Sequence, residues 1–152
     1  MGRRLGPEEA LACVPQQEPF RFVDEIVEID EEHVLGRYRW RPDAEFYRGH
    51  FPGDAVTPGV LLVECMAQAG VVPLAFLLFY LEMEESEAAK MLPLFTDVSV
   101  EFSGVVRPGE RVRVESRRIF YRRRKLRVHT EMQREDGTVV CAGEISGIGV
   151  LR

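Results

Sequence analysis

The chain has 152 residues, of which 45% are hydrophobic and 30% charged, and its formal net charge at pH 7 is −5. This length predicts one soluble domain over residues 1–152 with its own hydrophobic core. The acidic balance argues against a general nucleic-acid binder. The three cysteines are too far apart for a metal or redox pair, which favours a reducing, cytoplasmic location.

The first third of the chain predicts a short helix followed by two paired strands. Pro7 and the two glutamates after it open the helix with acidic side chains in its first turn. Phe20–Asp30 is β-branched and alternates in part, which predicts a strand, and His33–Arg41 is its expected partner. Because His33 directly follows the connecting turn, its side chain is expected on the surface.

An apolar run then predicts the central helix. Thr57 is the expected N-cap and Pro58 the first helical residue. Residues 60–81 leave almost no polar face, so the rest of the protein must wrap around this helix. The run is long enough to span a bilayer, but polar residues and Pro73 interrupt it, so we predict a buried core helix and no membrane insertion. Pro73 should kink or divide the helix.

The second half of the chain predicts strands only. Turn signals at Pro108-Gly109 and Asp136-Gly137 separate them, and no helical pattern intervenes. We therefore predict an α+β fold, a curled antiparallel sheet of about six strands around one long apolar helix. The four expected strands are Leu94–Phe102, Arg111–Phe120, Leu126–Arg134 and Thr138–Val150.

Two residues near the start of the central helix are candidates for chemistry. His50 lies in a Gly- and Pro-rich turn, and Glu64 lies inside the most apolar run, where an unpaired carboxylate is costly. Gly59 leaves a helix N-terminal N–H open to an oxygen that gains negative charge, and Gln68 lies one turn after Glu64. Structural roles remain open from the residues alone: a satisfied turn histidine, a carboxylate that reaches solvent, and a glycine that only follows Pro58.

Basic residues are concentrated in the second half. From Arg107 to Arg127 there are ten basic residues and two acidic ones, which is half of the 20 Lys and Arg side chains. Such a block is typical of a solvated face, and the alternative is a docking surface for an acidic partner.

The candidate residues His50, Gly59, Glu64 and Gln68 all lie in one long segment that resembles a family signature. GHFPGDAVTPGVLLVECMAQ (residues 49–68) resembles the signature of bacterial β-hydroxyacyl-acyl-carrier-protein dehydratases of the FabZ type, which have the hot-dog fold. PFRFVDEIVEID and VSVEFSGVVRPGERVRVE resemble the family's first strand and its strand–turn–strand after the helix, and the resemblance runs from about Val14 to Ile148. It implies elimination of water from a β-hydroxyacyl thioester to give the trans-2-enoyl thioester in type II fatty-acid biosynthesis.

The resemblance also implies a role for each candidate residue. His50 falls on the catalytic histidine, Glu64 on the catalytic carboxylate, and Gly59 on the residue whose N–H receives the thioester carbonyl. Val56 falls where a backbone carbonyl holds the imidazole, and Gln68 where a side chain orients the carboxylate. A near relative that also isomerises the double bond has Asp in place of Glu64, so plain dehydration is favoured. Whether histidine and carboxyl share the proton transfers, or histidine does both, stays open.

The implied partners are an acyl carrier protein and a second copy of this chain, with no metal or cofactor. The expected assembly is a homodimer in which His50 faces the partner subunit's Glu64, with a trimer of dimers as the larger form. Ser103–Val105 stand where the family usually carries basic residues. Gln16–Gln17 also depart from the pair that the family usually carries. The carrier is therefore expected on an arginine-rich surface of Arg117, Arg118, Arg122, Arg123 and Arg124.

The acyl tunnel is expected around Phe76, Phe79 and Phe95, and the sequence does not define its length preference. Two other classes of function compete with the dehydratase. One is another hot-dog enzyme acting on acyl thioesters, such as a thioesterase or a polyketide-pathway dehydratase. The other is a non-catalytic acyl-binding subunit, which would need neither His50 nor Glu64.

Overall fold

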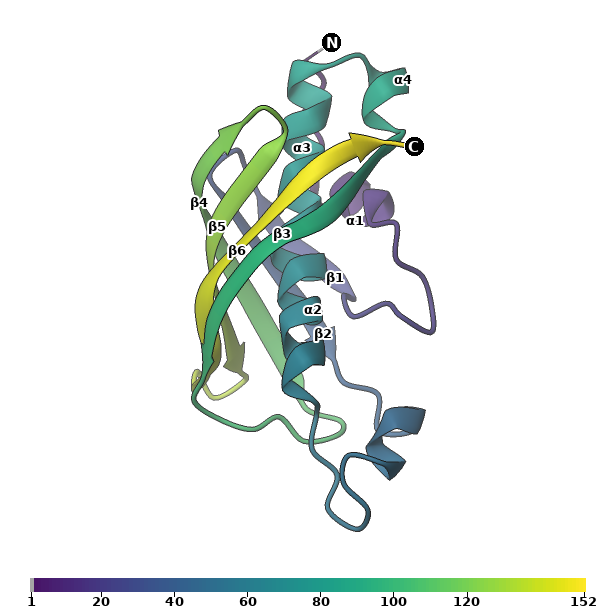
Figure 1. The fold of residues 1–152 in the computed structure, drawn as a ribbon, viewed down its shortest axis with the longest axis vertical. Helices are drawn as coiled ribbons and strands as arrows, with labels where there is room; N and C mark the ends of the chain where they lie inside the picture. Colours follow the sequence, from purple (N-terminus) through teal and green to yellow (C-terminus); the bar gives the residue numbers. More distant parts are fainter. Residues whose placement is uncertain (1) are drawn as a thin grey trace.

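The structure is a computed structural model and describes residues 2–152. One antiparallel sheet of six strands, in the order β1-β2-β4-β5-β6-β3, curls around the helices α2 and α3 (Figure 1). The elements are α1 (Pro7–Cys13), β1 (Glu25–Ile29), β2 (His33–Arg39), η1 (Glu45–Arg48), α2 (Gly59–Gly70), α3 (Val72–Glu82), α4 (Glu85–Ala88), β3 (Met91–Phe102), β4 (Arg111–Arg122), β5 (Lys125–Arg134) and β6 (Val139–Leu151). The predicted architecture is confirmed.

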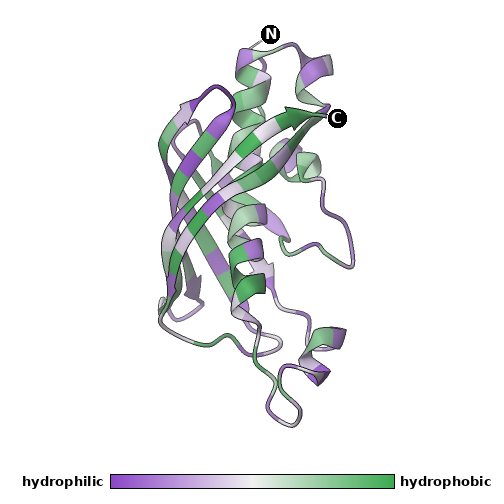
Figure 2. Cartoon of the chain, viewed as in Figure 1, coloured by the Kyte–Doolittle hydropathy of each residue, from purple (hydrophilic) through white to green (hydrophobic). Residues whose placement is uncertain are grey.

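The apolar helix lies inside the curl of the sheet (Figure 2). Gly59–Glu82 spans 24 residues, and its most apolar window has a mean hydropathy of 2.0, so it is long and apolar enough to cross a membrane. Yet 78% of that window is buried within the protein. The helix divides near Pro73, as predicted. Pro73 lies in the first turn of α3, where backbone N–H groups have no partner within the helix, so the proline costs α3 no hydrogen bond. We interpret α2 and α3 as the core of the fold.

Small residues let the sheet approach this helix closely. A Cβ on Gly36 would lie 3.0 Å from the Cβ of Ala69, and a Cβ on Gly70 would lie 2.2 Å from Ser116 Oγ. Side chains at these two glycines would force β2 and β4 away from α2. The close approach fixes which part of the helix each strand covers.

Several strand ends differ from the prediction by one to three residues: β3 begins at Met91, β2 ends at Arg39 and β4 ends at Arg122. Two further predicted boundaries are wrong because a polar group has a tertiary partner. Thr57 does not cap α2; its hydroxyl lies 2.6 Å from the Tyr47 hydroxyl, and the helix begins at Gly59 after Pro58. The first strand begins at Glu25 and not at Phe20. The residues before Glu25 make backbone hydrogen bonds to a helix side chain described below.

His33 is also not an exposed surface histidine, as had been expected. Its side chain is 12% exposed, and its Nε2 lies 2.8 Å from Glu115 Oε2 on the neighbouring strand β4. The pairing of β2 with β4, which a sequence pattern does not specify, brings these two residues to the same face.

Candidate active site

The turn that carries His50 is held from within and from the neighbouring loop. His50 and Val56 close it through a backbone bond of 2.9 Å from the Val56 N–H to the His50 carbonyl. From outside, Arg107 Nη1 donates to Asp54 Oδ1 at 2.8 Å and to the carbonyl of Ala55 at 3.1 Å. In Figure 1 the turn projects below the sheet, directly before α2. These contacts give the imidazole a defined position although it lies in a loop.

The tautomer of His50 follows from its hydrogen bond. Its Nδ1 lies 2.8 Å from the Val56 carbonyl oxygen, which can only accept, so Nδ1 carries the proton. The lone pair of the neutral ring is then on Nε2. The ring also stacks on Phe51, with centroids 4.1 Å apart. His50 is therefore oriented as a proton acceptor at Nε2.

Gly59 is the first residue of α2, and none of the described residues accepts a hydrogen bond from its N–H. This N–H also lies at the positive end of the helix dipole. A Cβ at this position would lie 3.2 Å from the ring of Phe102, so a side chain would press against that ring. The glycine leaves the N–H open to an incoming oxygen.

Glu64 lies one turn further along α2 and is partly buried. Gln68 Nε2 donates to Glu64 Oε2 at 2.8 Å and to the Phe20 carbonyl at 3.0 Å, while Gln68 Oε1 accepts from the Phe22 N–H at 2.6 Å. The Gln68 amide is thus fixed on both sides and holds the carboxyl group in one orientation. Burial raises the pKa of Glu64, and the Gln68 hydrogen bond opposes that rise only in part.

Within one chain these residues form two half-sites. His50 and Val56 lie on the turn, Glu64 and Gln68 lie on the helix, and no hydrogen bond or ion pair among the described residues joins the two groups. Large apolar side chains beside both halves are exposed. They are Phe20 at 49%, Phe51 at 53%, Val60 at 78% and Phe102 at 51%.

The aromatic residues expected to line a tunnel are not gathered in one place. Phe76 and Phe79 are 3% and 1% exposed, and their rings are in contact at 5.5 Å inside the core. Phe95 lies on the edge strand β3 with 48% of its surface exposed. The tunnel assignment stays a prediction.

The expected carrier-docking arginines lie on and around the β4–β5 hairpin. Arg123 and Arg124 form its turn, with φ of 54° and 65°. The neighbouring Tyr121 donates its hydroxyl proton to Glu82, the last residue of α3, at 2.5 Å. The hairpin is therefore at the end of the helix pair opposite Gly59 (Figure 1).

Two parts of the site were not anticipated from the sequence. Phe102 lies over Gly59, and the backbone of Phe20 and Phe22 holds Gln68. No sequence signal marks either contact, because each joins segments more than 40 residues apart. The described residues contain no group of three or more His, Cys, Asp or Glu side chains placed to hold a metal ion.

Comparison with solved structures supports the hot-dog architecture. The dehydratase heterocomplex ApeI:P from Xenorhabdus doucetiae superimposes with a TM-score of 0.73 at 18% identity, covering 99% of this chain and 94% of that one. The thioesterase HI1161 from Haemophilus influenzae gives a TM-score of 0.67 at 15% identity, with 98% and 93% coverage. At these identities the likeness concerns the fold alone.

Proteins of similar sequence identify the family, which the likeness in fold does not. The 3-hydroxyacyl-[acyl-carrier-protein] dehydratase FabZ of Caldicellulosiruptor saccharolyticus is 35% identical over 141 residues, 89% of this chain and 91% of the relative. The protein of the same name from Bacillus thuringiensis is 35% identical over 146 residues, with 93% and 94% coverage. The FabA-like domain family matches residues 14–144. The chain therefore belongs to the FabA-like domain family and, within it, to the FabZ type.

Proposed function

We propose that the protein is a 3-hydroxyacyl-acyl-carrier-protein dehydratase, a hydro-lyase that forms the trans-2-enoyl thioester in fatty-acid biosynthesis in the cytoplasm. The observation that carries the proposal is the orientation of His50, whose Nδ1 proton is held by the Val56 carbonyl at 2.8 Å so that Nε2 is left as the base. This imidazole lies on the turn that leads into the open N-terminus of α2. A base beside an oxyanion donor is what α-proton abstraction from a thioester needs.

The first step is removal of the α-proton. His50 Nε2 accepts it, and negative charge develops on the thioester oxygen. The Gly59 N–H donates to that oxygen, and one such donor contributes roughly 2.7–4 kcal/mol to transition-state stabilisation. Because Gly59 has no side chain, the oxygen can approach the N–H closely.

The second step is loss of the β-hydroxyl group. Glu64 is suited to protonate it, since burial raises the pKa of this carboxyl group and favours its protonated form. The C–O bond breaks, water leaves, and the electron pair of the enolate forms the double bond. Transfer of the proton from His50 back to Glu64 restores both groups, so the reaction consumes no cofactor.

The same proposal includes a homodimer in which His50 of one subunit meets the partner subunit's Glu64. Three features support it: no hydrogen bond or ion pair among the described residues joins the two half-sites, the surface beside them is apolar, and β3 lies at an edge of the sheet. β3 runs for 12 residues and exposes Leu94, Phe95 and Val98, and in the described part of the chain it pairs with β6 alone. Long apolar edges of this kind pair with other chains.

Mixing two inactive variants tests the shared site. His50→Ala and Glu64→Gln subunits that are co-refolded should recover about a quarter of wild-type activity, because half of the dimers are mixed and each has one intact site. The measurement is the dehydration rate of the mixture against that of each variant alone. If both residues act within one chain, no mixed dimer has an intact site, and the absence of recovery would contradict this arrangement.

The reaction itself is tested with β-hydroxybutyryl thioester. Mass spectrometry should show loss of one water from the acyl group, together with the absorbance of an enoyl thioester. Release of free thiol without dehydration would identify a thioesterase instead, and binding without turnover would identify a non-catalytic acyl-binding subunit.

A further inference from the structure

Two buried hydroxyl groups meet at the base of the His50 turn. Thr57 does not cap α2, and its hydroxyl lies 2.6 Å from the hydroxyl of Tyr47, where either group can donate the proton. The two residues are 3% and 6% exposed. Removal of one hydroxyl would therefore leave the other, among the described residues, without a hydrogen-bond partner and shielded from water.

The peptide unit between Val56 and Thr57 orients the imidazole of His50. It is planar and trans, so its carbonyl and its N–H point in opposite directions. The carbonyl, from Val56, accepts the Nδ1 proton of His50 at 2.8 Å, and the N–H, from Thr57, donates to the Val106 carbonyl at 2.9 Å. Any rotation of this unit at Thr57 would turn the acceptor that sets the tautomer of His50.

Thr57 also leads directly into the N-terminus of α2. The next residue, Pro58, has a φ of −58° that its ring restricts, and its carbonyl accepts from the N–H groups of Leu61 and Leu62 at 2.9 and 3.1 Å. The peptide after Pro58 carries the open N–H of Gly59. The position of Thr57 thus affects both the proposed base and the proposed oxyanion donor.

Tyr47 comes from the other end of the same loop. It belongs to η1, the short helix at the lower right of Figure 1, and precedes His50 by three residues. Its ring packs against that of Phe46, with centroids 4.6 Å apart. The bond from Tyr47 to Thr57 therefore closes residues 48–56 into a short loop, and closure of this kind reduces the number of conformations that the loop can adopt.

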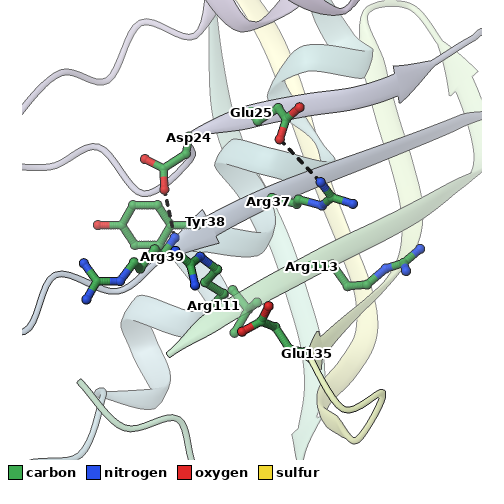
Figure 3. Close-up of a pocket in the computed structure, with 9 residues that line it drawn as sticks. Asp24, Glu25, Arg37, Tyr38, Arg39, Arg111, Arg113 and Glu135 are labelled. Carbon is green, nitrogen blue, oxygen red and sulfur yellow. Dashed lines mark hydrogen bonds and ion pairs between the residues drawn. The ribbon is translucent and has the colours of Figure 1, made fainter. Parts of the chain in front are cut away.

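No carboxylate among residues 2–152 forms a hydrogen bond with the ring of His50, although a carboxylate commonly orients a histidine base. Asp54, on the same turn, is paired with Arg107. Asp24 and Glu25 line an outer pocket of about 470 Å³ and interact there with residues of β2 (Figure 3). A backbone carbonyl is thus what orients the ring, and the support of that carbonyl decides where the ring lies.

We infer that the Tyr47–Thr57 hydrogen bond is a positioning contact, which holds the peptide that orients His50 and leads to Gly59. The inference rests on the proposed function, because the groups that it positions are the base and the oxyanion donor of that reaction. Neither hydroxyl acts on the substrate itself. A displacement of about 1 Å can lower the rate of an enzyme by about 10²-fold, so a contact that acts through other residues has a measurable effect.

The variants Thr57→Val and Tyr47→Phe each remove one hydroxyl and keep the shape of the side chain. The kcat for β-hydroxybutyryl-N-acetylcysteamine should fall about 10- to 10²-fold in each, with little change in KM. Y47F/T57V should be no slower than the slower single variant, because both changes break the same contact. Thr57→Ser keeps the hydroxyl and should retain most of the wild-type kcat.

The variant Thr130→Val is the matched control. Ser116 Oγ donates to Thr130 Oγ1 at 2.9 Å, and both residues are 0% exposed, so this change also breaks a buried pair of hydroxyl groups. Its melting temperature should fall like that of Thr57→Val, but its kcat should stay at the wild-type value. A loss of kcat in Thr130→Val as large as that in Thr57→Val would overturn the inference, since lost stability alone would then explain both.

The tautomer of His50 provides a readout that does not depend on activity. The chain has three histidines, and ¹⁵N NMR of their rings distinguishes a proton on Nδ1 from one on Nε2. At pH 8 the wild type and Thr57→Ser should show His50 with the proton on Nδ1 alone. Thr57→Val and Tyr47→Phe should show both tautomers of His50, with the signals of His33 and His129 unchanged.

The inference fails if Thr57→Val and Tyr47→Phe keep the kcat of the wild type, or if both keep the single tautomer of His50. It also fails if their losses multiply in Y47F/T57V, because the two residues would then act independently. Should Tyr47→Phe not fold, the comparison of Thr57→Val with Thr57→Ser carries the same test. If the wild type does not dehydrate the thioester, the proposed function fails, and the NMR comparison still decides whether the hydroxyl pair orients His50.

Discussion

Replacing His50 by alanine is expected to lower kcat/KM for dehydration by about 10²–10⁴-fold, the usual contribution of a positioned general base. Nε2 carries the lone pair that is proposed to accept the α-proton, and alanine has no side-chain group that could accept it. The measurement is the initial rate of enoyl formation from β-hydroxybutyryl-N-acetylcysteamine, which reports on chemistry without carrier docking.

Folding should survive this change. Among residues 2–152 the His50 side chain makes one hydrogen bond, to the Val56 carbonyl, and the turn keeps its contacts with Arg107. His129→Ala is a matched control, because His129 is an exposed imidazole on the β5 strand and its removal should leave the rate unchanged. Turnover by His50→Ala close to that of His129→Ala would refute the assignment of the base.

Replacing Glu64 by glutamine is expected to remove most of the activity while making the protein more stable at pH 8. An amide cannot protonate the leaving hydroxyl group, yet its oxygen can still accept the hydrogen bond from Gln68. The gain in stability comes from the raised pKa of Glu64, because ionising a partly buried carboxyl group costs free energy in the folded state.

The sign of the pH dependence follows from that shift. Below the usual carboxyl pKa both the folded and the unfolded chain keep the proton, so Glu64 carries no penalty. As the pH rises, the unfolded chain loses its proton first. The penalty on the folded state grows and is complete above the raised folded-state pKa. Urea unfolding should therefore show a larger advantage of Glu64→Gln over wild type at pH 8 than at pH 4, and an equal or reversed difference would contradict the raised pKa.

Comparison with Glu64→Ala separates the two routes for proton transfer. If Glu64 is the acid, glutamine and alanine should both lose most of the rate. If His50 does both transfers and Glu64 only orients the hydroxyl group, glutamine should retain much of the rate and alanine should not. The ratio of the two kcat values decides between them.

Much of this fold could be predicted from local patterns. The apolar run that became α2 and α3, its division near Pro73, and the alternation of the later strands each reflect a periodicity of the residues themselves. Asp136-Gly137 marks a tight turn for the same local reason, since Gly137 has a φ of 89°. The motif of residues 49–68 placed His50, Gly59 and Glu64 together as candidates through its resemblance to a family.

What the sequence did not determine depends on partners that are remote along the chain. Thr57 bonds to Tyr47 and not to the helix end, His33 pairs with Glu115, and the expected strand before Glu25 is replaced by backbone that holds Gln68. In each case a polar group interacts with a residue from another element, and local sequence preferences do not specify such a contact.

The arginines show the same division. By itself the sequence determined that basic residues are concentrated after Arg107, because composition is a local property of the chain. Only the tertiary structure decided which of them lie opposite one another on neighbouring strands. The β2–β4 register brings Arg37 and Arg39 opposite Arg113 and Arg111, while Tyr121 ties the hairpin to Glu82, at the end of the α2–α3 pair opposite Gly59 of the same chain. Strand pairing and helix length set these positions, because each depends on contacts between segments that are far apart in the sequence.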